Sequence, residues 1–213
     1  MLTALLALAL QIAPQSGAAI VPMEAGASWV FSARVRWTLP DSNQVRRSSI
    51  RWEMRITEVH ESEGIKAAVV RGFPFPLAWY EPGERPGFDV LVKRSDGLWL
   101  AEANSEEEAK ELAKRAVAGE AIGEMLLRFP VRVGDCVGGD PDRTDGRYCW
   151  SVERRIKEQG VPGWEIAYRT NPDHQLLRLV PGLGIRGFTY EHHGTVASAT
   201  AAQCARQWSA SSM

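Results

Sequence analysis

The fold class is decided by the stretch Trp29-Val30-Phe31-Ser32-Ala33-Arg34-Val35-Arg36-Trp37-Thr38-Leu39. Its odd-numbered side chains are apolar and most of its even-numbered side chains are polar, which predicts a strand with one buried face. The stretch from Ile50 to Ile56 repeats the pattern, and the turn residues 40–43 join the two stretches into a hairpin. We therefore expect these side chains to face the core: Trp29, Phe31, Val35, Trp37, Ile50, Trp52, Met54 and Ile56.

Further runs of strand type follow along the chain, at 65–71, 88–93, 98–101, 124–129, 147–156, 163–170, 175–180, 185–192 and 195–201. One helix is predicted over 105–118, because Ser105 and Glu108 form a capping box and Gly119 supplies a stop. Leu112 and Ala116 should pack this helix on the sheet. About ten strands joined in sequence order predict a mainly β fold, an antiparallel meander that forms a barrel, a half-barrel or a sandwich, with one α-helix.

Composition and charge are those of one globular domain. The chain has 213 residues, and its 25 basic and 26 acidic residues give a net charge of −1. Because no segment gathers lysine and arginine into a dense block, we expect no nucleic-acid partner. No later apolar run approaches the roughly 20 residues that a membrane helix needs, so the protein is not expected to be transmembrane.

The first segment is typical of an export signal. Residues 1–13 are apolar apart from Thr3 and Gln11, and small residues follow at Ser16 and Ala18. We expect a signal peptide over 1–18, a single β-rich domain over 19–204 and a flexible C-terminal tail over 205–213. The protein should then be exported and should be periplasmic or extracellular.

Three cysteines lie in the second half of the chain. In an oxidising compartment Cys136 and Cys149 are well placed to form a disulfide across a short loop rich in glycine and aspartate. Cys204 would then be left over in a small-residue tail after the final strand. A Cys149–Cys204 pair and three free thiols remain the alternatives.

A residue spacing in the first half of the sequence is weakly repeated in the second half. The spacing of Pro22, Gly26 and Trp29 returns as Pro130 and Gly134, with Val137 at the tryptophan position. Each set precedes a strand and a hairpin. This pattern raises the hypothesis of a duplicated β unit, while two matched residues also arise by chance.

Both ends of the chain resemble uncharacterised exported bacterial β-rich proteins. The opening Pro22-x-x-x-Gly26-x-x-Trp29 and the closing hairpin around Pro181-Gly182-Leu183-Gly184 carry the resemblance. It implies an antiparallel β fold outside the cytoplasm, and it assigns no catalytic residue. A looser architectural similarity to periplasmic lipoprotein carriers concerns the fold alone and does not establish a function.

No motif of established chemistry stands out, so we assign no catalytic, cofactor-binding or metal-binding residue. His192 and His193 are neighbours on a predicted strand and should point to opposite faces, which does not suit one metal ion. The aspartate-rich loop 135–146 lacks the spacing of a calcium-binding EF-hand. The chain has no G-x-S-x-G nucleophile motif.

The aromatic stretch 73–80 is the best candidate for a binding surface. Phe73, Phe75, Trp79 and Tyr80 would close over an apolar ligand at the barrel mouth, or meet a partner. The alternative is that these rings fill the barrel end as core.

From these features we favour a non-enzymatic binding or scaffold domain over an enzyme. Its ligand would be apolar, with a lipid or another envelope protein as the partner. A secreted hydrolase with an unrecognised site and a purely structural envelope protein are the alternatives. A polar cleft with a buried carboxylate or histidine would favour the hydrolase.

Overall fold

The computed structural model describes residues 20–39, 44–75, 86–139, 147–170, 173–192 and 195–205, without the side chains of 202–205. Within these ranges the chain forms twelve strands and one helix: β1 (Ser28–Thr38), β2 (Val45–Ser62), β3 (Ile65–Arg71), β4 (Phe88–Lys93), β5 (Gly97–Ala103), α1 (Glu106–Val117), β6 (Glu124–Arg128), β7 (Cys136–Val137), β8 (Trp150–Glu158), β9 (Val161–Arg169), β10 (His174–Val180), β11 (Gly184–His192) and β12 (Thr195–Ala205). The expected count was about ten. The two-residue strand β7 is too short to show an alternating pattern.

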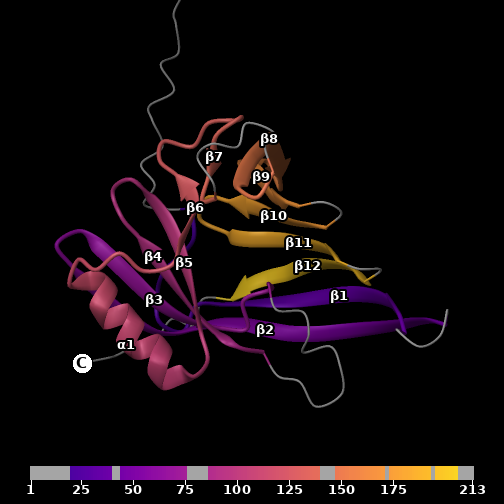
Figure 1. Ribbon diagram of the computed structural model, residues 1–213, viewed down its shortest axis with the longest axis horizontal. Coiled ribbons are helices and arrows are strands. Elements are labelled where there is room, and N and C mark those ends of the chain that lie inside the picture. The colour runs from indigo at the N-terminus through magenta and orange to yellow at the C-terminus, as the bar shows by residue number, and fades with distance from the viewer. Residues whose placement is uncertain are drawn as a thin grey trace, which may run out of the picture.

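All strands belong to one antiparallel meander. The sheet order is β6-β5-β4-β3-β2-β1-β12-β11-β10-β9-β8-β7, so the first and last strands pair and join the two halves. The sheet curls until its edge strands β6 and β7 approach each other (Figure 1). A Cβ added to Gly138, which follows β7, would lie 3.0 Å from the main-chain oxygen of Met125 in β6. The mainly β prediction is confirmed, and the form is a nearly closed barrel.

The inner face of β1 and β2 carries the core, as their alternation predicts. Trp29, Phe31, Met54 and Ile56 are fully buried, while Trp37 and Ile50 are half-buried against the same cluster. Full burial of such a side chain contributes about 1.5–3 kcal/mol. This cluster fills the barrel interior.

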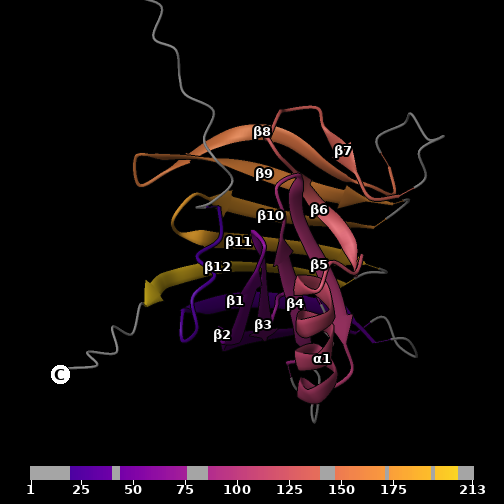
Figure 2. The same cartoon turned by 90° about the vertical axis from the view of Figure 1, so that its left-hand side faces the viewer.

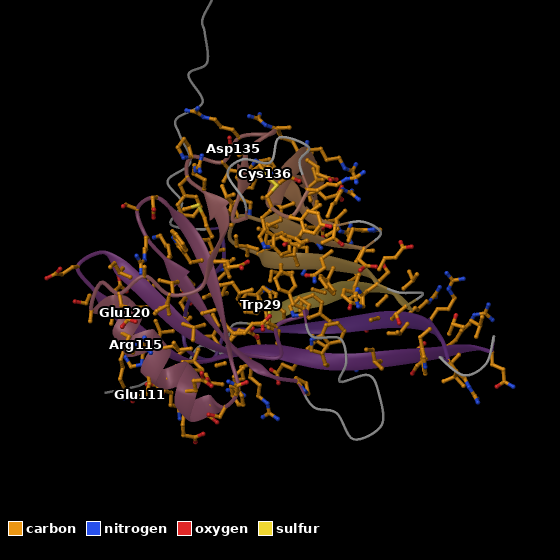
Figure 3. All side chains as sticks on the ribbon, viewed as in Figure 1. Trp29, Glu111, Arg115, Glu120, Asp135 and Cys136 are labelled. Carbon is orange, nitrogen blue, oxygen red and sulfur yellow. A yellow bond between two sulfur atoms is a disulfide. The ribbon has the colours of Figure 1, made fainter. Side chains whose placement is uncertain are left out.

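The two ends that carry the family resemblance contact each other in the core. Trp29 lies inside the barrel (Figure 3), and its indole N–H donates to the Leu183 carbonyl at 2.6 Å. The next residue, Gly184, has a φ of +76°, and a Cβ there would lie 2.9 Å from the Trp29 ring. Only glycine fits this turn between β10 and β11 without strain. The opening tryptophan is therefore held by the closing turn.

Helix α1 packs on the outer side of the first half of the sheet (Figure 2). Ala109, Ala113 and Ala116 are its buried residues, and small side chains let a helix approach a sheet closely. Leu112 is half-buried beside them. The helix ends where Gly119 takes a φ of +95°, as expected from the sequence. Among the described residues, no helix is long and apolar enough to cross a membrane.

The N-cap of α1 gives a first stability prediction. The Ser105 hydroxyl accepts a hydrogen bond from the Glu108 N–H at 3.1 Å. Ser105→Ala should lower the free energy of unfolding by about 1 kcal/mol, because one helix N–H loses its partner. Urea denaturation would measure this. Ser105→Asp restores a capping oxygen and should remain close to wild type, and equal stability of all three proteins would contradict the cap.

The repeated spacing in the sequence coincides with a repeated local structure. Gly26 and Gly134 have φ values of +86° and +93°, a region that glycine adopts without strain. Each glycine N–H donates to the carbonyl of one residue on the next strand, Ile56 or Val152, at 2.9 Å. The backbone N–H of Ile56 or Val152 donates in return to the carbonyl of the residue after the glycine. In both halves a β-bulge follows Ile56 or Val152. Strands β1–β3 thus correspond to β7–β9.

The two halves differ on their outer faces. Val69 of β3 is covered by α1. Glu165 holds the equivalent position in β9, because it comes directly before the residue that pairs with Val152. Glu165 is buried and accepts two hydrogen bonds from Arg154, at 2.6 and 2.9 Å. Charge pairing therefore replaces helix packing in the second half.

Cys136 and Cys149 form the expected disulfide, with their Cα atoms 5.8 Å apart, and Cys136 is labelled in Figure 3. The sequence predicts that Cys204 follows the final strand, and this prediction is wrong. Cys204 lies within β12, whose pairing with β1 continues to Ala205. The predicted signal peptide over 1–18 and residues 206–213 of the predicted tail lie outside the described residues.

Candidate functional site

The predicted aromatic surface divides into a core residue and a pocket residue. Phe73 is fully buried, and Phe75, which is half-buried, meets it edge to face at 4.7 Å between ring centroids. Trp79 and Tyr80 lie outside the described residues. The segment after β3 therefore enters the barrel, at least as far as Phe75.

Phe75 joins an aromatic row on the inner face of the second half. Its ring stacks on Trp150 of β8 with centroids 4.9 Å apart and planes 8° apart, and Phe188 of β11 lies 5.8 Å away. Trp150 in turn lies 5.3 Å from Tyr168 of β9. Such pairs contribute about 0.5–1.5 kcal/mol beyond their buried area. The row holds the segment after β3 against strands of the opposite half.

A pocket of about 520 Å³ opens beside this row. It lies between α1, β5 and β6 of the first half and β8, β9 and β10 of the second. Its lining residues are Phe75, Leu100, Ala101, Glu102, Glu108, Leu112, Gly123, Glu124, Trp150, Tyr168 and Gln175. The volume is within the range of small-molecule sites. The two halves of the repeat thus build the pocket together.

The polar lining is dominated by hydrogen-bond acceptors. Glu102 and Glu124 are exposed in the pocket, and the Gln175 side-chain oxygen is buried without a hydrogen-bond partner among the described residues. Burial, followed by the negative charge of Glu124, raises the pKa of Tyr168. That phenol is therefore neutral at physiological pH. The pocket can stack against an apolar ring and accept hydrogen bonds from the same molecule.

A buried carboxyl group lies next to this pocket. Asp89 of β4 is 2 % exposed and is the cross-strand partner of Glu102. Both belong to the inner face, because their strand neighbours Leu91 and Leu100 belong to the core. Burial, and secondly the charge of Glu102, raises the pKa of Asp89 from 3.8 to about 7. One Asp89 oxygen has no hydrogen-bond partner among the described residues.

Asp89 is not among the predicted site residues, although its position in the sequence carries a signal. It is the single charged residue within the otherwise apolar run 88–92. A charge in such a run is rarely buried without a partner, so it marks a site that merits attention.

The histidines form carboxylate contacts. His192 lies 2.7 Å from Asp173, and His174 lies 3.8 Å from Glu191 on the neighbouring strand. Within the part of the chain that the structure describes, no group of three or more histidine, cysteine or acidic residues is placed to hold a metal ion. His193 and residues 140–146 of the aspartate-rich loop lie outside that part.

The chain has detectable similarity to solved structures. No family model matches the chain, and no curated protein does. The solved structures that are similar to it include two crystal structures, each at 9% sequence identity. One is a predicted exported protein with a YmcC-like fold from Bacteroides fragilis, with a TM-score of 0.45 over 88% of this chain and 99% of that chain. The other is a predicted lipoprotein from Parabacteroides distasonis, with a TM-score of 0.39 over 88% and 98%.

Proposed function

We propose that this protein is an extracytoplasmic binding protein that holds a small molecule in the pocket between its two halves. The observation that supports this proposal is the pocket, with its aromatic wall and the Gln175 oxygen, which has no hydrogen-bond partner among the described residues. The disulfide and the apolar residues 1–13 support a location outside the cytoplasm. Such a protein would be periplasmic or secreted.

The lining indicates the chemistry of the ligand. Phe75 and Trp150 offer an apolar, stacked wall, which favours a ring or an acyl group. Glu102 and Glu124 are acceptors when ionised, and a charged acceptor prefers a donor that is itself positive. We therefore propose an amphiphilic ligand with an apolar face and an amino or hydroxyl group. A lipid headgroup with an amine has this character.

The first experiment is native mass spectrometry of protein purified from the periplasm of an expression host. A copurifying small molecule, released on unfolding, is the expected result. Once that molecule is identified, the double variant Glu102→Gln, Glu124→Gln should bind it at least about tenfold more weakly, because hydrogen bonds to charged groups contribute about 1.5–3 kcal/mol. Isothermal titration calorimetry would measure the affinity.

The matched control is the double variant Glu63→Gln, Glu107→Gln, which removes two exposed carboxylates that are not among the pocket's lining residues. It should leave the affinity unchanged. Equal weakening by the control would show that net charge and not the pocket governs binding. Purified protein that carries no ligand would favour the purely structural alternative.

A hydrolase is the second candidate, and Asp89 is the observation that favours it. A carboxyl group with a pKa of about 7 beside the second carboxyl of Glu102 has the protonation state that general acid–base catalysis needs. The identified ligand distinguishes the two functions. A binding protein returns it intact, whereas a hydrolase converts it and loses turnover in Asp89→Asn while binding persists.

A further inference from the structure

The outer face of the long hairpin carries a group of arginines. We call it the arginine face, and it consists of Arg34 and Arg36 of β1, Arg47, Arg51 and Arg55 of β2, and Arg71 of β3. All six are exposed. Between 32 and 57, the outward-pointing described positions of β1 and β2 include one acidic residue, Glu53. The face is therefore strongly positive although the whole chain is nearly neutral.

Several of these arginines are placed against each other. Arg36 is the direct cross-strand partner of Arg47, and Arg55 is the partner of Arg71. Like charges directly opposite each other destabilise an antiparallel pair. The chain pairs arginines with carboxylates elsewhere, since Arg154 binds Glu165. No arginine of the face forms an ion pair with a carboxylate of the described residues, so these guanidinium groups are available to an external anion.

Hydroxyl groups accompany the arginines. Three hollows of about 480, 590 and 560 Å³ lie along the face. Ser49 and Ser198 line the first two hollows together with Arg34, and Thr57 lines the third with Arg55. Guanidinium and hydroxyl donors together suit phosphate oxygens. Their spread over several strands suits many anions on a surface better than one bound anion.

The tip of the same hairpin adds an apolar element. The pairing of β1 with β12 ends at Arg36, so Thr38 and its partner Val45 extend beyond the paired part of β1. Val45 is 49% exposed, and Arg47, two residues further along β2, points to the same face. An exposed aliphatic side chain next to arginines is the arrangement by which proteins insert shallowly between lipid headgroups.

We propose that the arginine face docks on an anionic membrane surface, with Val45 at the level of the lipid headgroups. Phosphate groups would satisfy the opposed arginines, and the bilayer would cover Val45. An acidic polysaccharide would match the charges, but it would leave Val45 in water. The pocket lies between β5, β6 and β8–β10, so this docking is separate from ligand binding.

The test measures cosedimentation of the whole chain with vesicles of phosphatidylcholine containing phosphatidylglycerol, compared with vesicles of phosphatidylcholine alone. Binding should be stronger to the anionic vesicles and should weaken as salt rises. The triple variant Arg34→Gln, Arg36→Gln, Arg47→Gln should lower the partition coefficient on anionic vesicles by about 100-fold, since each surface arginine contributes about fivefold. Its partition on phosphatidylcholine should not change, which separates charge from any apolar segment of the chain.

The control is the triple variant Arg128→Gln, Arg132→Gln, Arg155→Gln. These three arginines are exposed away from the arginine face, and the change in net charge is the same. Their loss should lower anionic binding only slightly. Equal losses in the two triple variants, or equal binding of wild type to both vesicle types, would overturn the proposal.

Two further variants separate the alternatives. Val45→Ser should weaken vesicle binding and leave binding to heparin, a soluble acidic polysaccharide, unchanged. Heparin binding without anionic vesicle binding would overturn the membrane proposal in favour of a polysaccharide partner. The pocket variant Glu102→Gln, Glu124→Gln should bind vesicles at least as well as wild type, so failure of one proposal is distinguishable from failure of the other.

Discussion

Trp52→Ala is expected to lower the free energy of unfolding by about 3–5 kcal/mol. Trp52 is 7 % exposed, and its ring stacks on Phe31 with centroids 4.9 Å apart. Its indole N–H also donates to the Gly72 carbonyl at 3.1 Å. The substitution removes the largest side chain of β2 from the core and leaves a cavity between β1 and β3. Guanidinium denaturation followed by fluorescence and circular dichroism measures the change.

Arg51→Ala is the matched control on the same strand. Its side chain is exposed on the opposite face, and surface substitutions usually change stability by less than about 0.5 kcal/mol. A similar loss in both variants would contradict the assignment of the two faces of β2.

Asp89→Asn should stabilise the protein at neutral and alkaline pH. The raised pKa of Asp89, about 7 against 3.8, means that the folded state holds a proton that the unfolded state releases. This difference in pKa corresponds to a loss of about 4 kcal/mol in the free energy of unfolding once the buried group must ionise. Asparagine carries no charge, so it removes this penalty. Part of the gain in stability is lost, because the N–H groups of its buried amide need hydrogen-bond partners.

The sign of this effect defines its pH window. Below about pH 4 the carboxyl is protonated in both states, and it contributes no penalty. Wild-type stability should fall on account of Asp89 as the pH rises from about 4 to 7, and the penalty should then be constant. The advantage of Asp89→Asn should therefore grow through the same window. Chemical denaturation at several pH values measures it.

Asp96→Asn is the control for this experiment. Asp96 is exposed in the turn between β4 and β5, and its replacement should produce no comparable gain. An advantage of Asp89→Asn that does not depend on pH would contradict a buried, ionising carboxyl group.

Only part of the candidate site could be predicted from the sequence. Phe75 was predictable because aromatic residues cluster around it in the chain, and this residue lines the pocket. Glu102, Tyr168 and Gln175 were not predictable, because they are ordinary strand residues until the barrel brings them together. The arginine face was not predictable either. Alternation with apolar residues hides the charge along the chain, and strand pairing places Arg36 beside Arg47.

The strands β1 and β2, their buried faces and the helix α1 follow from local sequence patterns alone. These features depend on side chains only a few residues apart, such as Ser105 and Glu108 at the N-cap. The tertiary structure decided the pairing of β1 with β12, the closure of the sheet into a barrel and the site around Asp89. Alternation specifies which face of a strand is buried but not which strand lies beside it, because pairing depends on register and chain closure between distant segments.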